Sequence, residues 1–284
     1  MNRSLRSVIS GLAIGIVLAS QAGAEGLPDI LGIQIGMSAR EAYAKLQAQI
    51  PDNNVQVIST NLPTIEKPII ATLNSTPKQP MAMGLEGDQI QVDVTLPPNQ
   101  QAVWRIDRQH SFAGKGIPKA TLLASLREKY GKETLTNVQK GRPAADDSQI
   151  GDLLWLFDDQ GRPASLPFPP EKTGSGMANV LTLSSCITTT SSSGNLSAME
   201  AYVNAPKSAR NAQMDWCYSS YTAVHVWVQQ SDPPELYGGM RMITVSLPFA
   251  VRAIENTMKW KQGIAEDQHK QDIEKAKQQG KPKL

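Results

Sequence analysis

Histidine and cysteine, which ligate many metal ions and serve as acids, bases or nucleophiles, are few in this 284-residue sequence and lie far apart. Its three histidines are His110, His225 and His269, and none stands in a pattern typical of a metal site with a second histidine, a cysteine or a carboxylate. The acidic pairs Asp146-Asp147 and Asp158-Asp159 lack the spacing of a calcium-binding loop, so we expect solvated turn residues there. The sequence therefore predicts neither a metal ion nor another cofactor.

Motifs for a catalytic nucleophile are missing from the sequence as well. There is no G-x-S-x-G sequence, the motif that exposes a reactive serine in α/β-hydrolases. Ser75 and Lys78 match S-x-x-K, but they stand in a proline-rich stretch, whereas that chemistry needs the two side chains one helical turn apart. Gly174-Ser-Gly176 lacks the third glycine of a phosphate-binding loop. A hydrolase would therefore need an acid–base pair built from residues distant in sequence.

The two cysteines, Cys186 and Cys217, are expected to form a structural disulfide, because an even pair in an exported chain is most simply a disulfide. Closing a loop of about 30 residues would stabilise the fold by roughly 3–4 kcal/mol on the chain-entropy model. The alternative is a catalytic or metal-binding thiol. Neither cysteine belongs to a C-x-x-C motif or stands at ligand spacing from a histidine.

Aromatic side chains on or beside the predicted strands are the remaining candidates for a functional surface. In the strand expected at 223–228, the three valines share one face, and His225 and Trp227 share the other. If the valines face the helices, His225 and Trp227 lie on an open sheet face, where aromatic residues suit protein recognition. Packing in the core is the alternative for each residue. The candidate partner-binding residues are Trp104, Trp155, Tyr218, Tyr221, His225 and Trp227.

Two predicted helices begin in a similar way, 80 residues apart. The first follows Gly36-Met37-Ser38, where Ser38 and Glu41 have the spacing of a capping box, and apolar residues then recur at every fourth position up to Pro51. The second follows Gly116-Ile117-Pro118 and carries the same apolar stripe. We interpret these segments as the starts of two related units. The alternative is that any two amphipathic helices with glycine-containing starts look alike.

Strands are expected after each helix. Those after the first cover residues 55–59, 81–85, 90–96 and 102–112, and those after the second cover 133–138, 152–157, 179–187, 223–228 and 242–249. The strand at 152–157 has large apolar residues on both faces and is expected to be buried on both. A short helix is expected at Ser197–Glu200, inside the loop that the disulfide would close.

These elements predict an α+β protein made of two tandem units, each a helix packed on an antiparallel sheet of about four strands. The first unit is expected at residues 25–113, and the second, enlarged by the disulfide loop, at 114–249. Residues 250–284 are expected to form a C-terminal helix that frays into a polar, solvated tail beyond about Gly263. Binding of the lysine-rich tail to an anionic surface is the alternative for that segment.

A Gly-Met-Ser helix start followed by four antiparallel strands, twice, resembles the tandem units of the secreted β-lactamase inhibitor protein family. It also resembles small bacterial envelope lipoprotein modules of the same helix-on-sheet type. In the order of its elements, the resemblance covers residues 30–250. Matching amino acids are confined to Gly36-Met37-Ser38 and Gly116-Ile117-Pro118. Each unit of the inhibitor family carries a disulfide, whereas residues 25–115 contain no cysteine. No binding residue is transferred, and β-lactamase inhibition is not inferred.

The first 24 residues have the pattern of a secretory signal peptide. Arg3 and Arg6 precede the 12-residue apolar segment Val8–Ala19, and a small-x-small cleavage site ends at Ala24. A membrane anchor is the alternative, but a span needs about 20 apolar residues. Cleavage would remove two arginines and no acid, which leaves a mature chain of zero formal charge in a periplasmic or secreted location.

These observations predict an exported, non-catalytic protein that binds a protein partner in the cell envelope through an open sheet face. A neutral mature chain gives no reason to expect nucleic-acid binding, and no stable membrane insertion is expected after cleavage. Two alternatives stay open: an envelope hydrolase with an unrecognised acid–base pair, and a small-ligand carrier, which requires a large apolar cavity. A close histidine–carboxylate pair at the base of a deep pocket would favour the hydrolase.

Overall fold

The computed structural model describes residues 26–62, 65–78, 86–137, 144–165, 196–210, 218 and 221–278. The segment expected to direct export, the strands expected at 81–85 and 179–187, and both Cys186 and Cys217 lie outside these residues. Export, cleavage and the disulfide therefore remain predictions.

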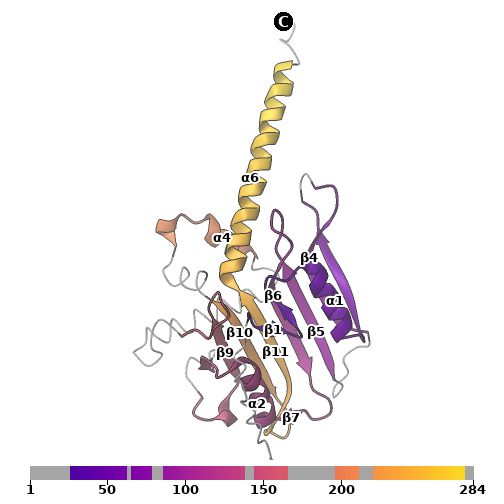
Figure 1. Ribbon diagram of the computed structural model, residues 1–284, viewed down its shortest axis with the longest axis vertical. Coiled ribbons are helices and arrows are strands. Elements are labelled where there is room, and N and C mark those ends of the chain that lie inside the picture. Colours follow the sequence, from indigo (N-terminus) through magenta and orange to yellow (C-terminus); the bar gives the residue numbers. More distant parts are fainter. Residues whose placement is uncertain are drawn as a thin grey trace, which may run out of the picture.

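The described chain is built around one antiparallel sheet, which has nine strands within these residues (Figure 1). The order across the sheet is β3-β4-β5-β6-β11-β10-β9-β8, and β7 pairs with the start of β11. The strands are β3 (Asn53–Thr60), β4 (Ile69–Pro77), β5 (Gly87–Val94), β6 (Val103–Ser111), β7 (Ile117–Pro118), β8 (Leu135–Thr136), β9 (Asp152–Phe157), β10 (Thr222–Gln230) and β11 (Leu236–Ser246). The α+β class with a large antiparallel sheet is confirmed.

Strand β4 is not predicted by the sequence, because its hydrophobic alternation is interrupted. The register between β3 and β4 shifts at Ala71, and the buried position 75 holds a serine rather than an apolar residue. Among the predicted strands, two differ most from the observed bounds. The strand expected at 133–138 is only the two-residue β8, and the one expected at 242–249 begins at Leu236 and ends at Ser246.

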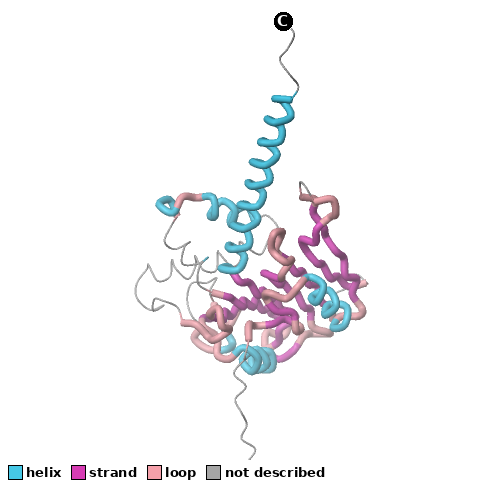
Figure 2. The backbone as a smooth tube through the Cα atoms, turned by 45° about the horizontal axis from the view of Figure 1, so that its top comes forward, coloured by secondary structure: helices cyan, strands magenta, loops and turns pink. Residues whose placement is uncertain are grey.

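Helices α1 (Ala39–Gln49) and α2 (Lys119–Tyr130) cover one face of the sheet, the α1/α2 face (Figure 2). Their buried residues, among them Leu46 and Leu126, pack with strand residues and with the small β1–β2 hairpin (Asp29–Ile30 and Ile33–Gln34). A second apolar cluster lies on the opposite face. There the first turns of α6 (Leu247–Gln278) and the short α4 (Leu196–Asn204) cover the sheet, and we call this side the α6 face.

The helix boundaries follow local signals. Ser38 caps α1 in the expected capping box, in which its backbone N–H donates to the Glu41 carboxylate at 3.1 Å and its hydroxyl accepts from the Glu41 N–H at 3.3 Å. Helix α2 ends at Gly131, whose φ of 78° lies in a region that side chains with a Cβ seldom occupy. Both helices therefore form where their apolar stripes predict them.

Helix α6 is longer than the sequence predicts. It begins at Leu247 and continues to Gln278 as one 32-residue helix that projects far beyond the sheet, so the expected fraying beyond Gly263 is wrong (Figure 1). The residues after Gly263 are mainly Ala, Glu, Lys and Gln, which favour helix enough to outweigh one glycine. Side-chain pairs such as Asp267–Lys270 and Glu274–Lys277 add support. The expected solvent exposure of this segment is confirmed.

Candidate functional site

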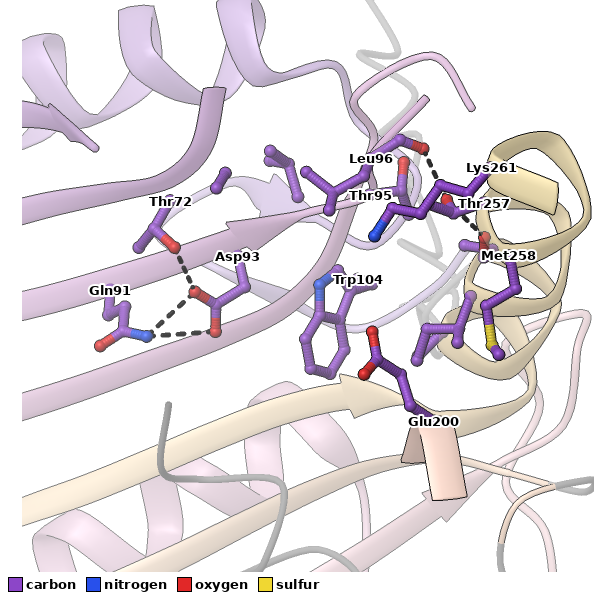
Figure 3. Close-up of a pocket in the computed structure, with 15 residues that line it drawn as sticks. Thr72, Gln91, Asp93, Thr95, Leu96, Trp104, Glu200, Thr257, Met258 and Lys261 are labelled. Carbon is purple, nitrogen blue, oxygen red and sulfur yellow. Dashed lines mark hydrogen bonds between the residues drawn. The ribbon is translucent and has the colours of Figure 1, made fainter. Parts of the chain in front are cut away.

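A pocket lies on the α6 face, between strands β4, β5 and β6 and the wall formed by α6; we call it the Trp104 pocket (Figure 3). Its volume is about 140 Å³. Its apolar lining is Ala71, Val94, Leu96, Trp104, Ala250, Ala253, Ile254 and Met258, and its polar lining is Thr72, Gln91, Asp93, Thr95, Glu200, Thr257 and Lys261. Figure 3 shows the Trp104 ring at its centre, between Asp93 on the sheet and Met258 on α6.

A bulge in β6 places Trp104 in this pocket. Asp93 pairs with Arg105 and Val94 pairs with Val103, so Trp104 is the extra residue in the register. Val103 packs in the cluster on the α1/α2 face, whereas Trp104 packs in the cluster on the α6 face. Two consecutive side chains, Trp104 and Arg105, therefore lie on the α6 face, which strict alternation does not predict.

Hydrogen bonds at the turn between β5 and β6 hold α6 in place beside the sheet. The Asn99 side chain donates to the carbonyl oxygen of Ala253 at 2.9 Å, and the Thr257 hydroxyl donates to the carbonyl oxygen of Leu96 at 3.2 Å. The wall of the pocket is therefore tied to its floor by side chains of both elements, and the site is largely formed without a ligand.

A row of charged side chains crosses the sheet next to the pocket. The Arg105 guanidinium, 1% exposed, donates to Asp93 and to Asp107 at 2.5 Å each. Asp107 also accepts from Arg241 at 2.7 Å, and Asp93 accepts from the Thr72 hydroxyl at 2.9 Å. The Asp93 carboxylate at the pocket edge is thus already engaged by several donors, so it is suited to holding Arg105 in place rather than to accepting a substrate proton.

The structure contains close histidine–carboxylate pairs, which the sequence analysis did not identify. His225 Nε2 lies 3.1 Å from Asp152 Oδ1, and these side chains are 0% and 4% exposed. The Trp227 ring lies over His225, with 3.8 Å between ring centroids. Burial lowers the pKa of His225, and the hydrogen bond to Asp152 opposes this only in part. The imidazole is therefore neutral at pH 7 and enclosed, and it does not line the Trp104 pocket.

A second pair lies on the neighbouring strands β5 and β6. His110 Nδ1 lies 3.0 Å from Asp88 Oδ1, and Arg108 Nε donates to the same oxygen at 2.5 Å. Burial raises the pKa of Asp88, but the hydrogen bonds from His110 and Arg108 outweigh it and lower that pKa to about 2. Only the strand pairing brings these residues together, because no short spacing links Asp88 to His110 in the sequence.

The residues predicted to bind a partner are mostly buried and do not form one open surface. Val224 and Val226 pack in the core of the α1/α2 face, as predicted, so His225 and Trp227 lie on the α6 face. However, His225 is fully buried, so the sheet face at this position is covered rather than open as expected. A strand face whose alternation is correct can still be enclosed by other parts of the chain, and sequence periodicity does not report what covers it.

The other aromatic candidates divide between the two faces, and Tyr218 and Tyr221 pack in the α6-face cluster with Trp104 and Trp227. Trp155 lies on the α1/α2 face, 1% exposed, and its indole N–H donates to the carbonyl oxygen of Gly131 at 2.9 Å. Tyr218 is 2% exposed, and Tyr221 is half-buried with its hydroxyl 3.3 Å from the carbonyl oxygen of Ser165. Of the six candidates, only Trp104 lines the pocket. The expected burial of strand β9 on both faces is confirmed.

The S-x-x-K match has no catalytic geometry. Ser75 is fully buried in β4 and accepts a hydrogen bond from Asn53, while the Lys78 ammonium donates to the carbonyl oxygen of Pro51. Within the described ranges, no three His, Cys, Asp or Glu side chains gather as a metal site would require. In the same part of the chain, no helix has the length and apolar character needed to cross a bilayer.

Comparisons with protein-family models, with curated proteins and with solved structures found no match to this chain.

Proposed function

We propose that this protein is an exported, non-catalytic binding protein that holds a segment of a partner protein of the cell envelope in the groove beside α6. One apolar side chain of the partner would occupy the Trp104 pocket. The observation that carries this proposal is the pocket itself, which combines a central aromatic ring, aliphatic walls and a polar rim. Protein interfaces commonly have such an apolar, often aromatic, centre surrounded by polar groups.

The size of the pocket favours a protein partner over a small-ligand carrier. Pockets for drug-sized ligands have volumes of about 300–1,000 Å³. The Trp104 pocket, at about 140 Å³, is close to the roughly 150 Å³ of an engineered cavity that binds benzene. It therefore fits one side chain such as leucine or phenylalanine, whose backbone would continue along the groove.

The polar rim would orient such a segment. Glu200 on α4 and Lys261 on α6 are exposed and stand on two sides of the pocket in Figure 3. They offer one acceptor and one donor to polar groups that flank the apolar anchor of the partner. The buried Arg105–Asp93 ion pair keeps the sheet side of the groove rigid, which lowers the entropy lost on binding.

The same proposal includes two tandem units of helix and four strands. Along the chain, helix α1 is followed by β3, β4, β5 and β6, and helix α2 is followed by β8, β9, β10 and β11. Within each set, every strand lies beside the strand that follows it in the sequence. The last strands of the two sets, β6 and β11, pair with each other. This arrangement supports an internal duplication in which two four-strand sheets have joined edge to edge.

A hydrolase is the second candidate function, because two histidine–carboxylate pairs exist at 3.0 and 3.1 Å. The enclosed position of His225 argues against it, since a general base must reach the proton that it removes. His110 is also largely buried, and Asp88 is already held by Arg108. Neither pair contributes a residue to the pocket lining.

The test is capture of a partner by immobilised mature protein, residues 25–284, from envelope extract, with mass spectrometry of the bound proteins. We expect a stoichiometric partner whose binding falls at least tenfold in Ala71→Leu, which fills the pocket without leaving a cavity, and in Trp104→Ala. A synthetic peptide of the identified partner should then bind the wild-type protein and lose affinity when its apolar anchor is replaced by alanine.

The matched control is Lys277→Gln, at the exposed end of α6, which should capture the partner as the wild type does. Circular dichroism of each variant separates a lost pocket from a lost fold. Equal capture by Ala71→Leu and by the wild type would refute the pocket as the binding site. Capture lost in His110→Gln but retained in both pocket variants would move the site to the second histidine pair.

A further inference from the structure

One edge of the sheet is unusually open to pairing. Strand β3 pairs with β4 on one side, and within the described residues it has no strand on its other side. It is eight residues long, Asn53–Thr60, and contains no charged residue and no proline. Natural edge strands are normally shortened, charged or covered, because free N–H and C=O groups attract another strand.

Strand β3 also exposes apolar side chains. Val57 is 46% exposed and Ile58 is 48% exposed, on opposite faces of the same strand. Across the described part of the chain, the other large apolar residue that is similarly exposed is Ile273, on the projecting end of α6. The exposed apolar surface is therefore concentrated at the middle of the free edge.

The opposite edge of the sheet differs. Within the described residues it ends in β8, which is only the two residues Leu135–Thr136. A strand of two residues offers too few backbone groups to hold a second sheet, so β3 of one copy has no matching edge at β8 of another. Pairing of copies through unlike edges, which would build an open fibre, is thereby disfavoured.

We propose that β3 pairs in an antiparallel manner with β3 of a second copy of this chain, so that the two sheets form one continuous sheet across a two-fold axis. A second copy is the occupant because the strand carries no charge with which to select a charged peptide and no like charges to repel its own copy. The two-fold pairing uses both long edges and leaves the short β8 strands outermost, which closes the assembly as a dimer.

The register follows from the apolar residues. Directly opposite residues of a strand pair point to the same face of the sheet. A two-fold axis perpendicular to the sheet must therefore pass through a residue of β3 rather than between two residues. An axis at Val57 sets the two Val57 side chains opposite each other on the α1/α2 face and each Ile58 opposite Gln56 on the α6 face. It buries both exposed apolar residues at the centre of the interface.

The first test is the mass of the mature chain, residues 25–284, in solution, measured by sedimentation equilibrium over a range of concentrations. We expect a dimer for the wild type and a monomer for Val57→Lys, because the two added ammonium groups would face each other across the axis. Ile273→Lys adds the same charge at an exposed apolar position away from β3 and should remain dimeric. A monomeric wild type, or a dimeric Val57→Lys, would overturn the proposal.

The second test fixes the register by cross-linking. Directly opposite residues in an antiparallel pair have Cα atoms about 4.5–5.5 Å apart, which a disulfide can span. Val57→Cys should therefore give a disulfide-linked dimer on a non-reducing gel. Ser59 is also exposed and lies on the same face, but a cysteine there would lie about 13 Å from its copy along the strand, so Ser59→Cys should remain unlinked. Equal linking of both variants would refute the Val57 register. This interface is independent of the Trp104 pocket.

Discussion

Lowering the pH below 6.5 is expected to destabilise the fold through His225. The ring is completely buried, and burial lowers its pKa in the folded protein despite the hydrogen bond to Asp152. In the unfolded chain, the same histidine has its ordinary pKa of about 6.5. Below that pH the unfolded chain binds more protons than the folded one, so the free energy of unfolding decreases as the pH falls.

The unfolded chain sets the upper limit of the effect. When His225 binds no proton in the folded state, protonation of the unfolded chain lowers the free energy of unfolding by about 1.4 kcal/mol between pH 7.5 and pH 5.5. The assay is urea unfolding, followed by tryptophan fluorescence at both values. Glutamine in His225→Gln keeps a donor for Asp152 but does not titrate. Between pH 7.5 and pH 5.5, this variant should therefore lose less free energy of unfolding than the wild type, by up to this limit.

His269 provides the matched control, because it is exposed on the projecting part of α6. His269→Gln replaces an exposed imidazole and leaves the buried His225 in place, so this variant should keep the pH dependence of the wild type. An identical pH dependence in the wild type and His225→Gln would show that the buried pair does not contribute, and the reasoning from its burial would be wrong.

Three further predictions concern stability, each measured as the change in the free energy of urea unfolding at pH 7.5. Asp93→Asn should destabilise the fold by about 2–3 kcal/mol, because Arg105 is 1% exposed and loses one charged partner. Arg162→Gln, which breaks a surface pair with Asp158, should change stability by less than about 1 kcal/mol. Equal effects of the two substitutions would contradict this prediction. Ser38→Ala should cost about 1 kcal/mol through loss of the α1 cap, and Ser59→Ala, at an exposed serine, should cost almost nothing. Trp155→Phe should cost about 1 kcal/mol or more, because the Gly131 carbonyl oxygen loses its indole donor, and a neutral result would contradict the core role of that bond.

The α+β class and the face of each amphipathic element are determined by periodicity. The apolar stripes of α1 and α2 and the alternating valines of β10 identify the buried sides correctly, because spacing along a helix or strand decides which side chains point together. Capping signals are equally local, and Ser38 caps α1 in the capping box that its spacing to Glu41 predicts. The end of α6 is the exception, since one glycine there is outweighed by a long run of helix-forming residues.

The sequence by itself determined most of the elements and their buried faces, since both depend on neighbours within a few residues, and the interrupted alternation of β4 is the exception among the long strands. Only the tertiary structure decided which strands pair, and therefore that Asp152 meets His225 and that β6 joins β11. It also decided that a bulge turns Trp104 toward α6 and that β3 is left at the free edge. Strand order depends on contacts between distant segments, and the period of a strand shows that a face is buried without showing what buries it.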